Sequence, residues 1–276
     1  MADFFILGNP RSGTSLFRLI LNSHPSITVP PECGFALWLA DRYKGEFEDT
    51  QTYNYIMDVL NTRKFETWGL DFDAIDDQIQ RNQPKNYAGL CRCVYLAYAR
   101  KTEKNAEIVG DKNNYYINNM DLIKKYFSGS KKIFIVRDGR DVACSYRKLS
   151  EKNIVSKYRP ILKNDIAEIA MEWADSVDIM MASVKEGAIF IKYEDLLVSP
   201  EETLRYVCRH LGLDFHPLML GYERNNDEPK EFLQWKAKTL EGLDPGRIGG
   251  FKSELSDSNI NEFNAIAEKQ LTWLNY

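Results

Sequence analysis

The sequence predicts an α/β protein of three layers, with a central parallel sheet, a P-loop-type phosphate-binding loop and a mainly helical insertion. Short apolar runs such as KKIFIV at residues 131–136 alternate with segments of helical periodicity. Strands that alternate with helices pair in parallel through right-handed crossovers. A glycine-containing loop follows the first apolar run directly, as phosphate-binding loops do. At 276 residues the chain is long enough to form one large domain over residues 1–276.

The first predicted strand, residues 4–7, leads into the loop GNPRSGTS at residues 8–15 and then into a helix. The unpaired N–H groups and the positive dipole end of a helix start stabilise an anion. The nucleoside triphosphate signature G-x-x-x-x-G-K-[ST] has a lysine where this chain has Thr14, and Arg11 lies inside the loop. We therefore expect a phosphate site that is not built for magnesium–ATP. A βα turn without a ligand is the alternative.

Further strands are expected at residues 27–29, 107–110, 131–136 and 188–192, and further helices at 160–184, at 257–274 and after the Ser199-Pro200 cap signal. Between about residues 46 and 104 the strand pattern gives way to polar, mostly helical sequence, which we interpret as an insertion over the sheet. Its charges are those of a solvated helix face, or else the segment is a lid that shapes an acceptor pocket.

Composition excludes several classes of protein. The net charge of −4 argues against general nucleic-acid binding, which favours a basic face. Five scattered cysteines indicate reduced thiols rather than a disulfide framework, and the spacing of Cys91 and Cys93 does not suit a zinc site. The sequence starts without a basic leader and has no apolar stretch of membrane-spanning length, so we expect a cytoplasmic protein without membrane contact.

A second stretch, IFIVRDGRDVACSYRK at residues 133–148, suggests another anion site. Arg137 comes at the carboxyl end of a strand, where ligands bind in open α/β sheets, and Ser145 follows about two helical turns later. A purely structural interpretation is also open, since Asp138 and Asp141 suit a helix start and can pair with Arg137 or Arg140.

Together the two stretches resemble the sulfotransferases that use 3′-phosphoadenosine 5′-phosphosulfate (PAPS). The similarity continues through residues 191–215 and 246–256, and so covers most of the chain outside the insertion. It implies PAPS as donor and its desulfated product, PAP. The residues it places at the 5′-phosphosulfate are Arg11, Ser12, Gly13, Thr14 and Ser15, and those at the 3′-phosphate are Arg137 and Ser145.

Two other parts of the nucleotide site follow from the resemblance. Tyr193 is similar in place to a residue near the nucleotide, with a core tyrosine at a strand end as the alternative. Residues 247–252 look like the C-terminal loop that closes over the cofactor, with Gly249, Gly250 and Lys252 as contacts. A plain glycine hinge is the alternative there.

Sulfuryl transfer needs a base, positive charge near the transferring oxygens and in-line geometry, and it requires no metal. In the branch that includes tyrosylprotein sulfotransferases and many bacterial members, a glutamate shortly after the first helix is the base, and this chain has Glu32 there. A helix N-cap carboxylate is the alternative. Lys112 resembles a family lysine near the bridging oxygen, with Arg11 as the second cation. The family often has Thr-Pro after this lysine, whereas Asn113-Asn114 stand here, and Asp111 is expected to cap the next helix.

The resulting hypothesis is a PAPS-dependent sulfotransferase that acts on a hydroxyl or amine. A P-loop nucleotide-dependent kinase and a PAPS- or PAP-binding protein without turnover are the alternatives. The sequence leaves the acceptor and the oligomeric state undetermined.

Overall fold

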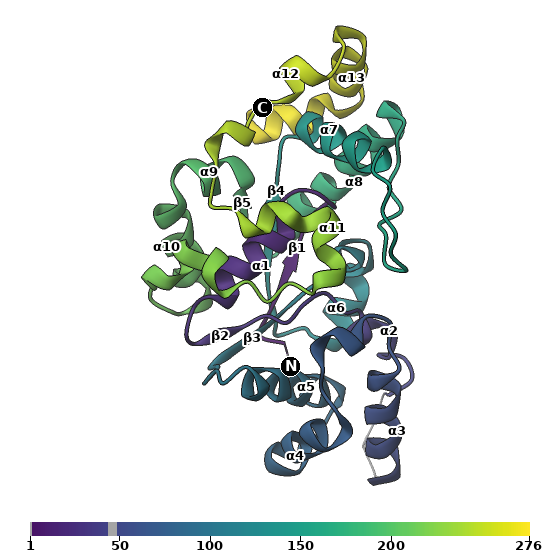
Figure 1. Ribbon diagram of the computed structural model, residues 1–276, viewed down its shortest axis with the longest axis vertical. Helices are drawn as coiled ribbons and strands as arrows, with labels where there is room; N and C mark the ends of the chain where they lie inside the picture. Colours follow the sequence, from purple (N-terminus) through teal and green to yellow (C-terminus); the bar gives the residue numbers. More distant parts are fainter. Residues whose placement is uncertain (1, 44–48) are drawn as a thin grey trace. The chain divides into compact units, whose positions relative to one another are not determined.

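The computed structural model describes residues 2–43 and 49–276, so the first part of the predicted insertion, residues 46–48, lies outside the described residues (Figure 1). Two compact units divide the chain. Unit 1 comprises Met1–Ile6, Arg18–Lys131 and His216–Pro229, and unit 2 comprises Leu7–Phe17, Lys132–Phe215 and Lys230–Tyr276. Within the described part of the chain the paired strands are parallel, in the order β2-β3-β1-β4-β5. The predicted parallel α/β architecture is confirmed.

Unit 1 contains β2 (Ile27–Thr28), β3 (Ile108–Lys112) and most of β1 (Phe4–Leu7). Phe5 lies opposite Asp111 and Ile6 opposite Lys112. Gly110 allows the Phe4 ring to approach, since an added Cβ would lie 2.3 Å from it. The prediction ended this strand at residue 110, two residues too early, because the charged pair Asp111-Lys112 interrupts the apolar run while the backbone pairing continues.

In the described part of residues 46–104, unit 1 forms the helices α3 (Asp49–Leu60), η1 (Phe65–Trp68), α4 (Phe72–Asn82) and α5 (Tyr87–Lys101). Outside that range it has α2 (Phe35–Trp38), η2 (Asn114–Asn119), α6 (Met120–Tyr126) and η3 (Pro217–Asn225). The largely buried α5 packs against β2, β3 and α4. This helix therefore belongs to the layer that covers the strands.

Unit 2 contains β4 (Lys131–Val136) from its second residue onward, β5 (Ile189–Lys192) and the start of α1 (Thr14–Asn22). Its other helices are α7 (Gly139–Ser150), α8 (Ile166–Lys185), α9 (Tyr193–Val198), α10 (Pro200–Leu211), η4 (Lys230–Phe232), α11 (Leu233–Lys236), η5 (Ala237–Leu240), η6 (Pro245–Arg247), α12 (Phe251–Glu254) and α13 (Asp257–Leu274). Helix α8 packs against both α7 and α13.

Two helix starts in unit 2 differ from their predictions. Helix α8 begins at Ile166 and not at residue 160, because the side chain of Asp165 caps it by accepting from the N–H of Glu168 at 3.0 Å. Helix α10 begins at Pro200 as expected, but the side chain of Ser199 makes no capping hydrogen bond. The Ser199-Pro200 signal therefore predicted the start of the helix correctly, but the capping hydrogen bond expected from the Ser199 side chain is not formed.

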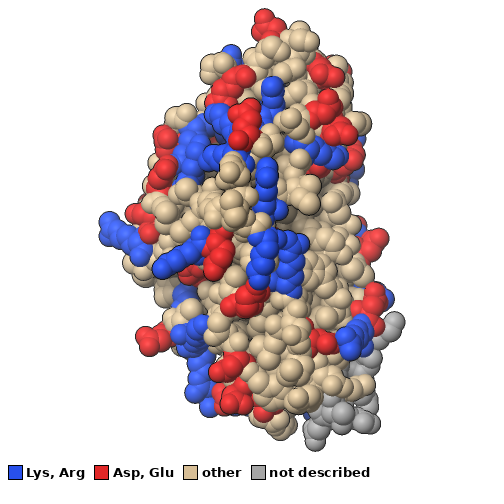
Figure 2. Space-filling model, turned by 45° about the vertical axis from the view of Figure 1, so that its right-hand side comes forward, with Lys and Arg blue, Asp and Glu red and all other residues tan. Residues whose placement is uncertain are grey.

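The described residues include no helix that is long and apolar enough to cross a membrane. Among the same described residues, no three His, Cys, Asp or Glu side chains lie together in a group that could hold a metal ion. All five cysteines are free thiols, as the sequence indicated, and all five are buried. On the face drawn in Figure 2, Lys and Arg side chains are interspersed with Asp and Glu and form no continuous basic surface.

Candidate active site

The loop between β1 and α1 has the tight geometry expected of a phosphate cradle. A Cβ at Gly8 would lie 2.5 Å from the carbonyl oxygen of Ile135, so the loop backbone passes directly against β4. Gly13 has φ +93°, and a Cβ there would lie 2.5 Å from the ring of Tyr193. Arg11 also has a positive φ of 67°. Larger residues at the two glycines would clash, so the loop depends on them.

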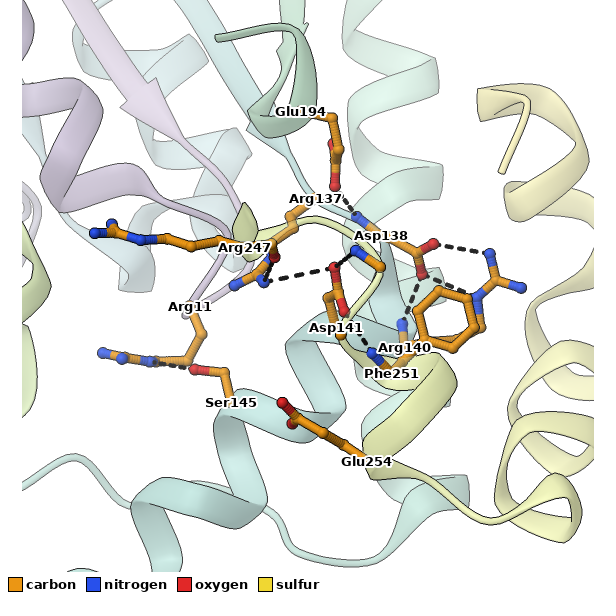
Figure 3. Close-up of polar contacts among 12 residues, drawn as sticks. Arg11, Arg137, Asp138, Arg140, Asp141, Ser145, Glu194, Arg247, Phe251 and Glu254 are labelled. Atoms are coloured by element: carbon orange, nitrogen blue, oxygen red, sulfur yellow. Dashed lines mark hydrogen bonds and ion pairs between the residues drawn. The ribbon is translucent and has the colours of Figure 1, made fainter. Parts of the chain in front are cut away.

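The side chain of Arg11 points to the second motif. Its Nε donates to Ser145 Oγ at 3.0 Å, and its Nη1 donates to the carbonyl oxygen of Trp235 at 3.0 Å (Figure 3). Burial and the positive charge of Arg137 lower the pKa of Arg11. The structure thus brings together residues that the sequence analysis assigned to opposite ends of a nucleotide, and it gathers positive charge around them.

Arg137 stands at the carboxyl end of β4, as predicted, and three groups fix its guanidinium. Nη2 donates to the carbonyl oxygen of Arg247 at 2.9 Å and lies 3.5 Å from Asp141 Oδ2. The guanidinium carbon lies 4.8 Å from the ring centre of Tyr193. Tyr193 is thus a buried tyrosine, and it also contacts both predicted phosphate motifs, at Gly13 and at Arg137.

Two buried polar atoms of these motifs have no hydrogen-bond partner among the described residues. They are Ser12 Oγ and Arg137 Nε. Leaving a buried donor unsatisfied typically costs about 1–3 kcal/mol, and more for a charged group. An anion with several oxygen acceptors would satisfy both, so the residues present fit a phosphate-bearing ligand.

Asp141 holds the C-terminal loop. Its Oδ2 accepts from the N–H of Gly249 and its Oδ1 from the N–H of Phe251, both at 2.9 Å (Figure 3). Gly249 has φ +71°, Gly250 is the N-cap of α12, and the Lys252 side chain is exposed. Asp141 was expected at a helix start and as a partner of Arg137 or Arg140, and its bonds to the C-terminal loop were not expected, because those partners lie more than 100 residues away in the chain.

The first turn of α7 is fixed as the structural interpretation proposed. Asp138 caps the helix by accepting from the N–H of Arg140 at 2.9 Å, and it also pairs with the guanidinium of Arg140 at 2.8 Å. The N–H of Asp138 donates to Glu194 Oε1 at 3.0 Å. This junction therefore holds Arg137 in place from the strand side.

In unit 1, Glu32 and Lys112 form an ion pair, with Lys112 Nζ 2.7 Å from Glu32 Oε2. The side chain of Lys112 is 1% exposed and that of Glu32 is 15% exposed. Gly34, and not Glu32, is the N-cap of α2, so the alternative of a helix-capping glutamate is wrong. A second lysine, Lys64, pairs with Glu32 Oε1. Lys64 lies in a polar segment without a motif, so no sequence signal pointed to it.

Two buried hydrogen bonds hold Asp111, the residue before Lys112 in the chain. Asp111 Oδ2 accepts from the hydroxyls of Tyr95 at 2.6 Å and Tyr116 at 2.7 Å. Burial raises the pKa of Asp111 to about 6. The expectation that Asp111 caps the next helix is wrong: Asn113 caps η2 by accepting from the N–H of Tyr115 at 3.0 Å.

Comparison with known proteins decides the family. The model of the sulfotransferase family matches residues 3–217. The chain belongs to the sulfotransferase family.

Among curated relatives, a protein-tyrosine sulfotransferase 1 from Danio rerio is 24% identical over 234 residues, which are 81% of this chain and 56% of that protein. The nodulation protein NoeE of Sinorhizobium fredii is 25% identical over 224 residues, 76% of this chain and 50% of that protein. The chain thus spans about half the length of the curated relatives it matches.

Solved sulfotransferase structures share the fold. The sulfotransferase domain of the Synechococcus PCC 7002 olefin synthase has a TM-score of 0.62 at 22% identity, covering 96% of this chain and 92% of that one. Mouse sulfotransferase SULT7A1, solved in complex with PAP, has a TM-score of 0.54 at 13% identity, covering 98% of this chain and 84% of that one.

Proposed function

We propose that the protein transfers a sulfuryl group from PAPS to a hydroxyl or amine acceptor and releases PAP. The observation that carries this proposal is the pair of unpartnered buried atoms, Ser12 Oγ and Arg137 Nε, among the described residues of the two anion motifs. The PAP in the mouse relative's structure supports the choice of nucleotide.

The residues of unit 2 would bind the nucleotide. The loop from Arg11 to Ser15 would hold the 5′-phosphosulfate with its N–H groups and hydroxyls. Arg137 and Ser145 would hold the 3′-phosphate, with Gly249, Gly250 and Lys252 closing over it. Because Arg11 already donates to Ser145 in this structure, we include its guanidinium among the groups that balance the nucleotide's charge.

The residues of unit 1 would carry the chemistry at the acceptor. In the transfer, the acceptor oxygen or nitrogen bonds to sulfur, the bond from sulfur to the phosphate oxygen of PAP breaks, and Glu32 takes the acceptor proton. Lys112 and Arg11 would offset negative charge on the transferring and leaving oxygens. The ammonium group of Lys112 on Glu32 supports an ionised carboxylate that can accept this proton.

The deciding experiment is transfer of radiolabelled sulfur from PAPS to a panel of alcohols, phenols, amines and glycans, with EDTA present. We expect a labelled product and a stoichiometric yield of PAP. The same panel with magnesium and ATP tests the kinase alternative, which a labelled phosphoryl product would support. Failure to bind either PAPS or PAP would contradict the proposal.

Two variants separate binding from transfer. Glu32→Gln should reduce transfer roughly 100-fold or more, because a general base contributes about that much, while PAP binding stays within about twofold. Arg137→Gln should instead weaken PAP binding roughly 10- to 100-fold through the loss of charge-assisted hydrogen bonds. Glu103→Gln and Arg205→Gln, both exposed, are the matched controls. Full transfer by Glu32→Gln would remove Glu32 as the base.

A further inference from the structure

Lys64 has no part in the transfer described above, although its ammonium contacts the proposed base. We propose that Lys64 is a positioning residue that holds Glu32 Oε1, so that the base stays paired and oriented when Lys112 turns toward the transferring group. This inference rests on the proposed function of Glu32 and Lys112.

The turn that carries Lys64 is attached to the segment around Glu32 at three points. Trp68 Nε1 donates to the carbonyl oxygen of Pro31 at 2.9 Å, and Cys33 Sγ donates to the carbonyl oxygen of Arg63 at 3.6 Å. The third point is the ion pair of Lys64 itself with Glu32. The turn that carries Lys64 therefore bonds to the backbone of Pro31, to the side chain of Cys33 and to the side chain of Glu32 between them.

The backbone of Lys64 favours another residue type. Its φ of 76° lies in the left-handed region, which glycine adopts readily and lysine does not. The conformation is held by local bonds, since Phe65 N–H donates to Thr62 O at 3.0 Å and Thr67 Oγ1 donates to Lys64 O at 2.7 Å. A glycine would form the same turn with less strain, so a role for this lysine resides in its side chain.

The charges explain what that side chain does. Lys112 is 1% exposed and is bonded to Glu32 Oε2, whereas the proposed transfer would place its ammonium at the oxygens of the sulfuryl group. Movement of Lys112 would remove one cation from Glu32, a carboxylate that is only 15% exposed, and removing a partner from a mostly buried charge is costly. Lys64 keeps the carboxylate paired. Each carboxylate oxygen accepts more than one hydrogen bond, so the acceptor hydroxyl can still bind.

The backbone strain supplies a test that distinguishes positioning from a structural role. Lys64→Gly should leave the thermal midpoint unchanged or raise it, and PAP affinity should stay within about twofold. Its kcat should nevertheless fall roughly 10- to 100-fold with little change in the KM for PAPS, as expected for a misplaced base. Lys64→Arg should recover part of the lost kcat, because it restores the charge. Gln83→Gly is the matched control, since Gln83 also has a positive φ, of 42°, and is exposed at the end of α4.

A second measurement needs no acceptor. In a thermal unfolding cycle, Glu32→Gln, Lys64→Met and the double variant should give midpoint changes that do not add, because the single variants break the same ion pair. Additive changes, or a Lys64→Gly enzyme with wild-type kcat, would overturn the role of Lys64 while leaving the proposed function intact. A wild-type protein that transfers no sulfur from PAPS would contradict the proposed function, and the inference with it.

Discussion

At the scale of single residues, the two units compensate charge in opposite ways. In unit 2, burial and the positive charge of Arg137 lower the pKa of Arg11, and Arg137 Nε has no partner among the described residues. In unit 1, one carboxylate lies between two ammonium groups, those of Lys64 and Lys112. Buried guanidinium groups of like charge favour binding of an anion, whereas two ammonium groups beside a carboxylate favour its ionised form, which is the form that can accept a proton.

The buried carboxyl of Asp111 should make stability depend on pH. Burial raises its pKa from 3.8 to about 6, so the folded state holds a proton that the unfolded state releases. Stability is then lost as the pH rises from about 4 to 6, by at most about 3 kcal/mol. Asp111→Asn should remove this loss, so its free energy of unfolding relative to wild type should rise between pH 4 and pH 7. Urea unfolding at both pH values measures the difference.

Tyr116→Phe is the companion variant for this prediction. The hydroxyl of Tyr116 donates to Asp111 Oδ2 and favours the ionised carboxyl, so its removal should raise the pKa of Asp111 further. The loss of stability should then extend to higher pH. Parallel pH curves for wild type, Asp111→Asn and Tyr116→Phe would show that Asp111 does not titrate in this range.

At the scale of elements, the sequence identified junctions but not the contacts between distant segments. Both anion motifs were found because each is a continuous stretch, a strand followed by a loop and a helix, with its own periodicity and glycines. Lys64 and the role of Asp141 were missed, because their partners are separated from them by 32 and 108 residues of chain. The end of β3 was misplaced for a related reason: Asp111 and Lys112 are charged, and only their pairing with β1 keeps them in the strand.

The Asp141 contacts predict that one buried carboxylate controls the order of the C-terminal loop. Asp141→Asn leaves a single side-chain oxygen, so either Gly249 N–H or Phe251 N–H loses its acceptor. We expect a loss of about 1–3 kcal/mol in unfolding free energy and PAP binding weakened by roughly tenfold or more. Calorimetric titration with PAP and urea unfolding measure the two effects. Asp178→Asn, half-exposed on α8, is the control, and equal PAP binding by both variants would contradict the loop's role.

At the scale of the whole molecule, the two compact units are interleaved in sequence. Each consists of three segments, and three of the divisions fall inside an element: in β1 after Ile6, in α1 after Phe17 and in β4 after Lys131. No single cut in the chain separates them. Composition and periodicity could not reveal this division, because both units share the same alternation of strands and helices. The expectation of one domain over residues 1–276 stays a prediction.

Because two strands and one helix are each divided between the units, we predict that the units unfold together and that PAP stabilises both. A ligand at 100 times its Kd adds about 2.7 kcal/mol, which should raise the thermal midpoint by roughly 5 °C. Cys91 in unit 1 and Cys208 in unit 2 are buried and can report it by thiol labelling at rising temperature, followed by mass spectrometry. The labelling midpoints of both cysteines should rise equally with PAP, and in Arg137→Gln at the same PAP concentration they should rise by about half as much or less. A shift confined to Cys208 would show that the units unfold independently and that PAP binds only unit 2.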